Sequence, residues 1–141
     1  MSAPQTDSPL AERVLACMME AVIHADRQGL IALWNPAAET MFGFSTAEAI
    51  GQSLDIIIPE RLREAHWRGF HAAIASGRTR LNGRPTLTRA LHRSGATLYV
   101  EMSFALVCAA NGEVIGSVAV ARDATERVER EKAARSGGLA G

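Results

Sequence analysis

The strongest constraint on the fold is a regular alternation of apolar and polar or small residues over 97–106. The apolar positions are Leu98, Val100, Met102, Phe104 and Leu106. Successive side chains of a strand point to opposite faces, so this segment predicts a β-strand with one buried face. Asn111-Gly112 follows, a dipeptide typical of tight hairpin turns, and a valine-rich run occupies 114–121. The pattern therefore predicts an antiparallel β-hairpin in the second half of the chain.

The first half adds two short strands and several helices. Apolar runs at 21–26 and 30–34 flank a glycine-containing loop and predict a second hairpin, and residues 87–93 predict a fifth strand. Helix start and stop residues predict helices over 9–20, 36–42 and 59–77, a short one after Ser45, and a charged one over 126–135. The fold class expected is α+β, with a five-stranded antiparallel sheet and helices on one face. We expect one domain: an N-terminal flanking helix (1–20), a core (21–123), and a C-terminal helix with a flexible tail (124–141).

Charge and hydropathy exclude several classes of protein. The 141 residues include 15 basic and 15 acidic ones, so the formal net charge is zero. The basic residues form no cluster, which argues against nucleic-acid binding. No apolar run approaches the roughly 20 residues that span a bilayer, and the first residues do not resemble a signal peptide. We therefore expect a cytoplasmic protein. Cys17 and Cys108 have apolar neighbours and no metal-binding spacing, and we expect both to be small buried residues.

Catalytic motifs are missing from the sequence. It contains no Ser-His-Asp arrangement, no HExxH, no P-loop and no Gly-x-Gly-x-x-Gly. Glu60, Glu64 and Arg68 are better explained as charges on the surface of a helix than as acid–base groups. The sequence gives no indication of an enzyme.

Two histidines on the long helix are the candidate binding residues. At 3.6 residues per turn, His66 lies in the middle of the apolar stripe and His71 lies on the polar face. His71 is therefore expected to be solvated. Each ring nitrogen of a buried histidine needs a partner, which can be a metal, a backbone carbonyl or water. From the helix pattern alone, an ordinary core histidine is favoured over a ligand.

Several motifs together resemble the PAS family of sensory domains, over about residues 10–127. They are WNPAAETMFGFSTAEAIGQSL, IPERLREAHWRGF, LHRSGATLYVEMSFA and DATER. The resemblance implies a ligand pocket between sheet and helices. It also implies a role in signal coupling for Asp123 and Thr125, although both residues are equally explained as caps for free backbone amides. PAS domains bind haem, flavin, small organic ligands or nothing.

The haem-binding PAS domains of oxygen sensors offer a closer resemblance. His66 matches the histidine that holds their iron, and the resemblance places Arg84, Met102 and Phe104 on the opposite, distal side. We therefore expect haem b, with His66 as the iron ligand and a diatomic gas as the signal. The family cation six residues after the histidine is replaced by Ala72. Arg78, Arg80 or Arg89 are possible substitutes that do not match the pattern.

Three alternatives remain open. The leading one is a ligand-binding sensor, whose ligand could also be a small organic molecule, and the second is a cofactor-free interaction and dimerisation module. The third is a small-molecule enzyme on the same α+β scaffold. Flavin photochemistry is disfavoured, since no Asn-Cys-Arg motif is present. The apolar side of the first helix predicts a homodimer. Its residues are Leu10, Val14, Cys17 and Met18. A stand-alone sensor also requires a separate effector protein, such as a kinase or regulator.

Overall fold

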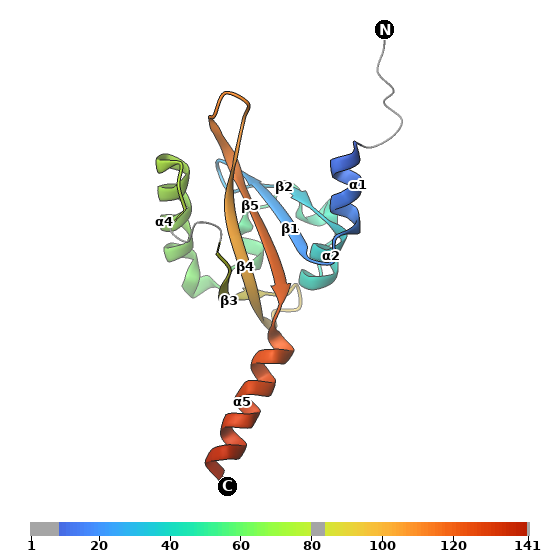
Figure 1. Ribbon diagram of the computed structural model, residues 1–141, viewed down its shortest axis with the longest axis vertical. Coiled ribbons are helices and arrows are strands. Elements are labelled where there is room, and N and C mark those ends of the chain that lie inside the picture. The colour runs from blue at the N-terminus through green and yellow to red at the C-terminus, as the bar shows by residue number, and fades with distance from the viewer. Residues whose placement is uncertain (1–8, 80–83, 141) are drawn as a thin grey trace.

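Five strands form one antiparallel sheet in the computed structural model, which describes residues 9–79 and 84–140. The strands are β1 (Ala21–Asp26), β2 (Ile31–Trp34), β3 (Thr86–Leu91), β4 (Thr97–Cys108) and β5 (Val114–Asp123). Their order across the sheet is β2-β1-β5-β4-β3 (Figure 1). The first and last strands in sequence are therefore neighbours, with Ile23 opposite Ala119. The predicted α+β class and five-stranded antiparallel sheet are confirmed.

Several helices begin or end at the residues that the sequence marks as caps. They are α1 (Leu10–Cys17), α2 (Pro36–Phe42), α3 (Thr46–Ala49), α4 (Glu60–Ser76) and α5 (Thr125–Ala140), with a 3₁₀ turn at Leu54–Ile57. Ser45 and Glu48 form the predicted capping box at the start of α3. Gly77, with φ of 75°, ends α4 in the left-handed conformation that glycine adopts without strain. Figure 1 shows α4 beside the sheet and α5 pointing away from it.

The alternating face of β4 contributes to the hydrophobic core, as predicted. Val100 is fully buried, and the neighbouring even-numbered residues are half-buried against the same core. They are Leu98, Met102, Phe104 and Leu106. Trp34 is buried, and Trp67 is half-buried over the core from α4. Burial of this face drives the packing of the helices onto the sheet.

Asn35 connects three elements at the N-terminal side of the sheet. Its side-chain oxygen accepts from the backbone N–H of Val22 at 2.9 Å and of Ala38 at 3.0 Å. Its amide nitrogen donates to the carbonyls of Leu15 and Glu20, each at 3.1 Å. All four hydrogen-bonding positions of this buried amide are thus occupied, which a buried polar group requires.

Three local predictions differ from the structure. Cys17 and Cys108 are both exposed, so the prediction that they are buried is wrong. Cys17 is the last residue of α1, which buries no residue, and Cys108 lies at a register shift at the end of β4. Helix α1 ends at Cys17 rather than near residue 20, and α5 extends to Ala140 rather than stopping at residue 135. None of the described helices has both the length and the apolar character needed to cross a membrane.

Candidate ligand site

His66 lies on α4 in an aromatic environment. Its ring is half-buried, 4.7 Å from the Trp67 ring centre in an edge-on arrangement and 6.0 Å from that of Phe70 in a stacked one. The Nδ1 atom is buried and has no hydrogen-bond partner among the described residues. Loss of solvent lowers the pKa of His66, and nearby Asp55 opposes this shift only in part. The imidazole is therefore neutral at about pH 7 and has one unsatisfied nitrogen.

Trp67 fixes α4 relative to the first hairpin. Its Nε1 donates to Oδ1 of Asp55 at 2.8 Å, and its six-membered ring covers Gly29. A Cβ atom at Gly29 would overlap that ring, and Gly29 also has a positive φ of 83°. The contact requires glycine for both reasons. No periodicity or motif in the sequence reveals this contact, because Gly29 and Trp67 are far apart in the chain.

His71 is exposed, as predicted. Its ring stacks on that of Trp67, with ring centres 5.8 Å apart. His66 and His71 therefore both contact Trp67.

The distal residues expected from the resemblance have different environments. Phe104 is half-buried and reaches the α4 aromatic cluster through Phe70, with ring centres 6.3 Å apart. Met102 is half-buried on the same face of β4. Arg84 is exposed and lies two residues before β3. Phe70 is almost fully buried, and its ring lies between α4 and Phe104 of β4.

The candidate cations for a ligand carboxylate are scattered. Arg78 is exposed just after α4, and Arg80 lies outside the described residues. Arg89 is exposed on β3, where its guanidinium carbon lies 5.5 Å from the ring centre of Tyr99.

Asp123 and Thr125 form hydrogen bonds at the junction between β5 and α5. Asp123 accepts from the N–H of Thr125 at 2.9 Å, and the hydroxyl of Thr125 accepts from the N–H of Tyr99 at 2.9 Å. The two residues thus cap free amides, as the sequence predicts. They also attach the start of α5 to β4.

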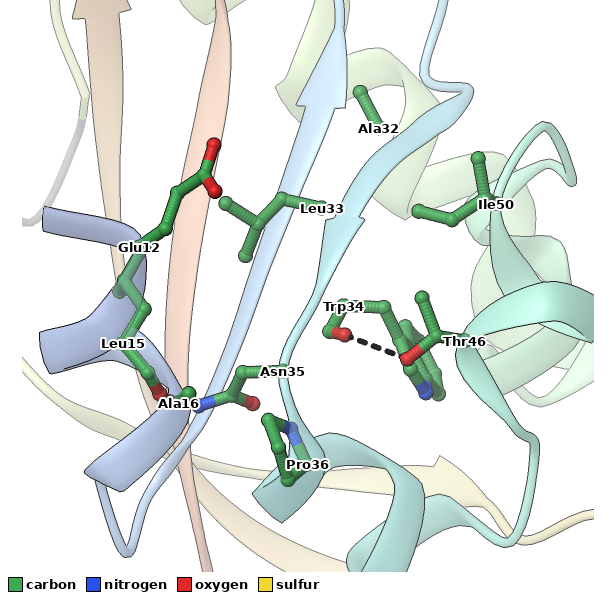
Figure 2. Close-up of a pocket in the computed structure, with 10 residues that line it drawn as sticks. All are labelled: Glu12, Leu15, Ala16, Ala32, Leu33, Trp34, Asn35, Pro36, Thr46 and Ile50. Atoms are coloured by element: carbon green, nitrogen blue, oxygen red, sulfur yellow. Dashed lines mark hydrogen bonds between the residues drawn. The ribbon is translucent and has the colours of Figure 1, made fainter. Parts of the chain in front are cut away.

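An open hollow of about 320 Å³ lies between α1, β2, α2 and α3 (Figure 2). Most of its lining is apolar, including Leu15, Leu33 and Ile50. Thr46 donates a hydrogen bond to the carbonyl of Trp34 at its inner wall. A second hollow lies at the β3 edge of the sheet. Neither is lined by His66, Met102 or Phe104, and sequence patterns indicated neither.

A family model described as PAS fold matches residues 17–129. The chain belongs to the PAS-fold family. It is 28% identical over 118 residues to the oxygen sensor protein DosP of Escherichia coli (strain K12), which is 84% of this chain and 14% of that protein. It is 43% identical over 53 residues to the sensor protein FixL of Bradyrhizobium diazoefficiens, which is 38% of this chain and 10% of that protein. The chain thus spans a small part of each relative.

Solved PAS structures share the fold of this chain. The PAS domain of a Colwellia psychrerythraea protein superposes with a TM-score of 0.72 at 24% identity, covering 83% of this chain and 98% of that one. The PAS domain of BvgS from Bordetella pertussis gives a TM-score of 0.65 at 18% identity, covering 93% and 96%. At these identities the likeness shows the fold alone. The family match and these structures together identify the chain as a PAS-fold domain.

Proposed function

We propose that this PAS-fold domain is a sensory module that binds haem b through His66 and responds to a diatomic gas. The observation that supports this most directly is the state of His66. Its ring is half-buried and neutral, and its Nδ1 has no partner among the described residues. A neutral imidazole is the form that ligates iron, and an unsatisfied buried ring nitrogen costs stability that a ligand can offset. The chemistry of the donor therefore fits the cofactor.

The residues around His66 have separate roles in this proposal. Bound haem would supply an iron centre that takes up a small neutral gas. Met102 and Phe104 would form an apolar wall that disfavours anions, and Arg84 would supply hydrogen-bond donors for a polar gas such as oxygen. The similarity to a protein named as an oxygen sensor supports the choice of gas.

Phe70 is the main obstacle to this ligand and favours a second candidate function. Its ring is in contact distance of both His66 and Phe104. A flat macrocycle held by His66 therefore requires the Phe70 side chain to move. If the ring stays in place, the chain functions as a cofactor-free interaction module or binds a smaller organic ligand.

We also propose that the module is not an enzyme and acts through contacts with other chains. Helix α1 leaves Leu10 76% and Val14 53% exposed and buries no residue of its own. Such an uncovered apolar face favours pairing with a second copy. The projecting helix α5 would pass the signal to a separate effector, such as a kinase or regulator, in the cytoplasm.

Reconstitution with haemin tests the ligand. The purified chain should take up one equivalent and develop a Soret band. His66→Ala should abolish this band, whereas the matched control His71→Ala should retain it. In the reconstituted protein, Arg84→Ala should weaken oxygen affinity more than carbon monoxide affinity, because the lost hydrogen bonds favour the more polar ligand. A wild-type chain that takes up no haemin would refute the haem proposal and leave the cofactor-free function in its place.

A further inference from the structure

The hollow at the β3 edge has a lining suited to an amphipathic anion. It measures about 350 Å³ and opens beside the first turn of α4. Its walls are Arg61 and Leu62 from α4, Leu87, Thr88 and Arg89 from β3, and Tyr99 from β4. Two arginines from different elements therefore line the same hollow, together with leucine, threonine and tyrosine side chains.

The residues that line this hollow include two arginines and no acidic residue. Six other arginines make ion pairs, namely Arg63, Arg68, Arg93, Arg122, Arg127 and Arg130. Arg61 and Arg89 make no such pair among the described residues. Glu101, directly opposite Leu87 on β4, is paired with Arg127 at 3.6 Å, and Glu64 is paired with Arg68 at 3.1 Å. The hollow consequently keeps a local excess of positive charge in a chain whose net charge is zero.

The apolar part of the lining is exposed in the same place. Leu87 is 50% exposed, and Leu62 is half-buried with its inner side against the core. A carboxylate matches the planar donor fork of arginine, and two leucines match a short hydrocarbon chain. We infer that this hollow binds a small amphipathic organic acid, with the carboxylate between Arg61 and Arg89 and the hydrocarbon along Leu62 and Leu87. This site is distinct from the His66 cluster and does not require haem.

Tyr99 connects the hollow to α5. Tyr99 lines the hollow beside Arg89, and its hydroxyl oxygen is 2.7 Å from Nζ of Lys132. An acid that draws Arg89 towards its carboxylate changes the electrostatic environment of that ring, and Lys132 lies on the same ring at 4.7 Å. Occupancy of the hollow is thereby transmitted to the C-terminal helix through one side chain.

Calorimetric titration of the full chain with octanoate tests the site. Octanoate should bind, whereas acetate, which lacks the chain, and octan-1-ol, which lacks the charge, should bind at least tenfold more weakly. Arg61→Gln and Arg89→Gln should each weaken octanoate binding about tenfold, the loss expected for one charge-assisted contact in a solvent-exposed site. Arg78→Gln is the matched control, an exposed arginine outside the hollow, and should bind as wild type. Arg61 and Arg89 are both exposed, so circular dichroism should show that both variants are folded.

Three results would overturn the inference. The first is equal octanoate affinity in the wild type and the Arg61→Gln/Arg89→Gln double variant. The second is binding of octan-1-ol as tight as that of octanoate. The third is a combination of two observations: the wild type does not bind octanoate, and the double variant takes up less haemin than the wild type. That combination would assign the two arginines to the haem carboxylates. His66→Ala should bind octanoate normally, so failure of the haem proposal leaves this result intact.

Discussion

The hydroxyl of Tyr99 in β4 lies 2.7 Å from Nζ of Lys132 in α5, which joins the only tyrosine of the chain to its only lysine. The backbone of Tyr99 contacts the same helix, because its carbonyl accepts from the N–H of Ala124 at 2.7 Å and its N–H donates to Thr125. One residue of the sheet thus holds the first two turns of α5 through backbone and side chain. A displacement of Tyr99 in β4 would therefore also displace the start of α5.

The Tyr99–Lys132 contact should be visible in the titration of the tyrosine. The hydrogen bond from Lys132 lowers the pKa of Tyr99 below its ordinary value of about 10, because a nearby cation favours the phenolate. Lys132→Met should raise this pKa towards the ordinary value, as measured by phenolate absorbance. Arg130→Met is the matched control, since Arg130 pairs with Glu126 on the same helix, and it should leave the titration unchanged. Identical curves for wild type and Lys132→Met would show that the contact is not formed in solution.

His66 should make stability depend on pH. Burial lowers its pKa in the folded state, so the unfolded chain binds a proton more readily. The contribution of neutral His66 to the free energy of unfolding is fully present above the pKa of the unfolded chain, which is about 6.5. This contribution is lost progressively as the pH falls towards the pKa of the folded state. Urea unfolding at about pH 7 and about pH 5 should show a larger loss of stability on acidification for the wild type than for His66→Gln. His71→Gln should retain the wild-type loss, and a His66→Gln variant with the same pH dependence would contradict the prediction.

Gly29→Ala should destabilise the domain by about 3 kcal/mol. The substitution combines a strained positive φ, which costs about 1 kcal/mol, with overlap between the new Cβ and the Trp67 ring, which costs about 2 kcal/mol. Gly51→Ala is the control, because Gly51 has a similar φ of 88° and open space around its Cβ position. Chemical denaturation should give Gly51→Ala a free energy of unfolding about 2 kcal/mol larger than that of Gly29→Ala. Equal losses would mean that Trp67 does not pack on Gly29.

Met102→Asp should destabilise the domain by roughly 3 kcal/mol or more. Met102 packs against the core, and the substitution places a carboxylate there without a partner. Ala105→Asp changes an exposed position on the opposite face of β4 and should cost less than about 1 kcal/mol. The comparison of the two melting temperatures tests which face is buried. A melting temperature of Met102→Asp within a degree of wild type would show that the even-numbered residues of β4 do not face the core.

Val14→Glu should convert the proposed homodimer to a monomer. Val14 is 53% exposed on α1, so a charge there should change the stability of the monomer little. In a dimer that pairs through α1, the same charge would be buried in the interface and would weaken it strongly. Static light scattering at high protein concentration measures the mass of both proteins. Glu12→Gln, another exposed change on α1, should remain dimeric. A wild-type chain that is monomeric at high concentration would rule out the dimer.

Local patterns in the sequence were enough to predict the sheet and most helix boundaries. The period-two pattern of β4 placed Val100 and its even-numbered neighbours in the core, because a half-buried strand permits one assignment of faces. Cap residues such as Ser45 and Gly77 marked helix ends because they satisfy or release backbone groups within a few residues. These are short-range effects, and the residues that cause them are adjacent in the chain.

Only the tertiary structure determined the environment of the site. The helical pattern put His66 on the apolar stripe. How α4 packs over β4 determines that Nδ1 finds no partner among the described residues and that the Phe70 ring lies beside it. The exposure of Cys17 and Cys108 was mispredicted because apolar neighbours in sequence do not ensure burial at the end of a helix or strand. Arg61 and Arg89 are 28 positions apart in the numbering and share one hollow only because β3 lies beside α4. The sequence determined the elements, because hydrogen bonds and side-chain periodicity within each element are local. The binding surfaces form between elements, where only the packed chain brings distant side chains together.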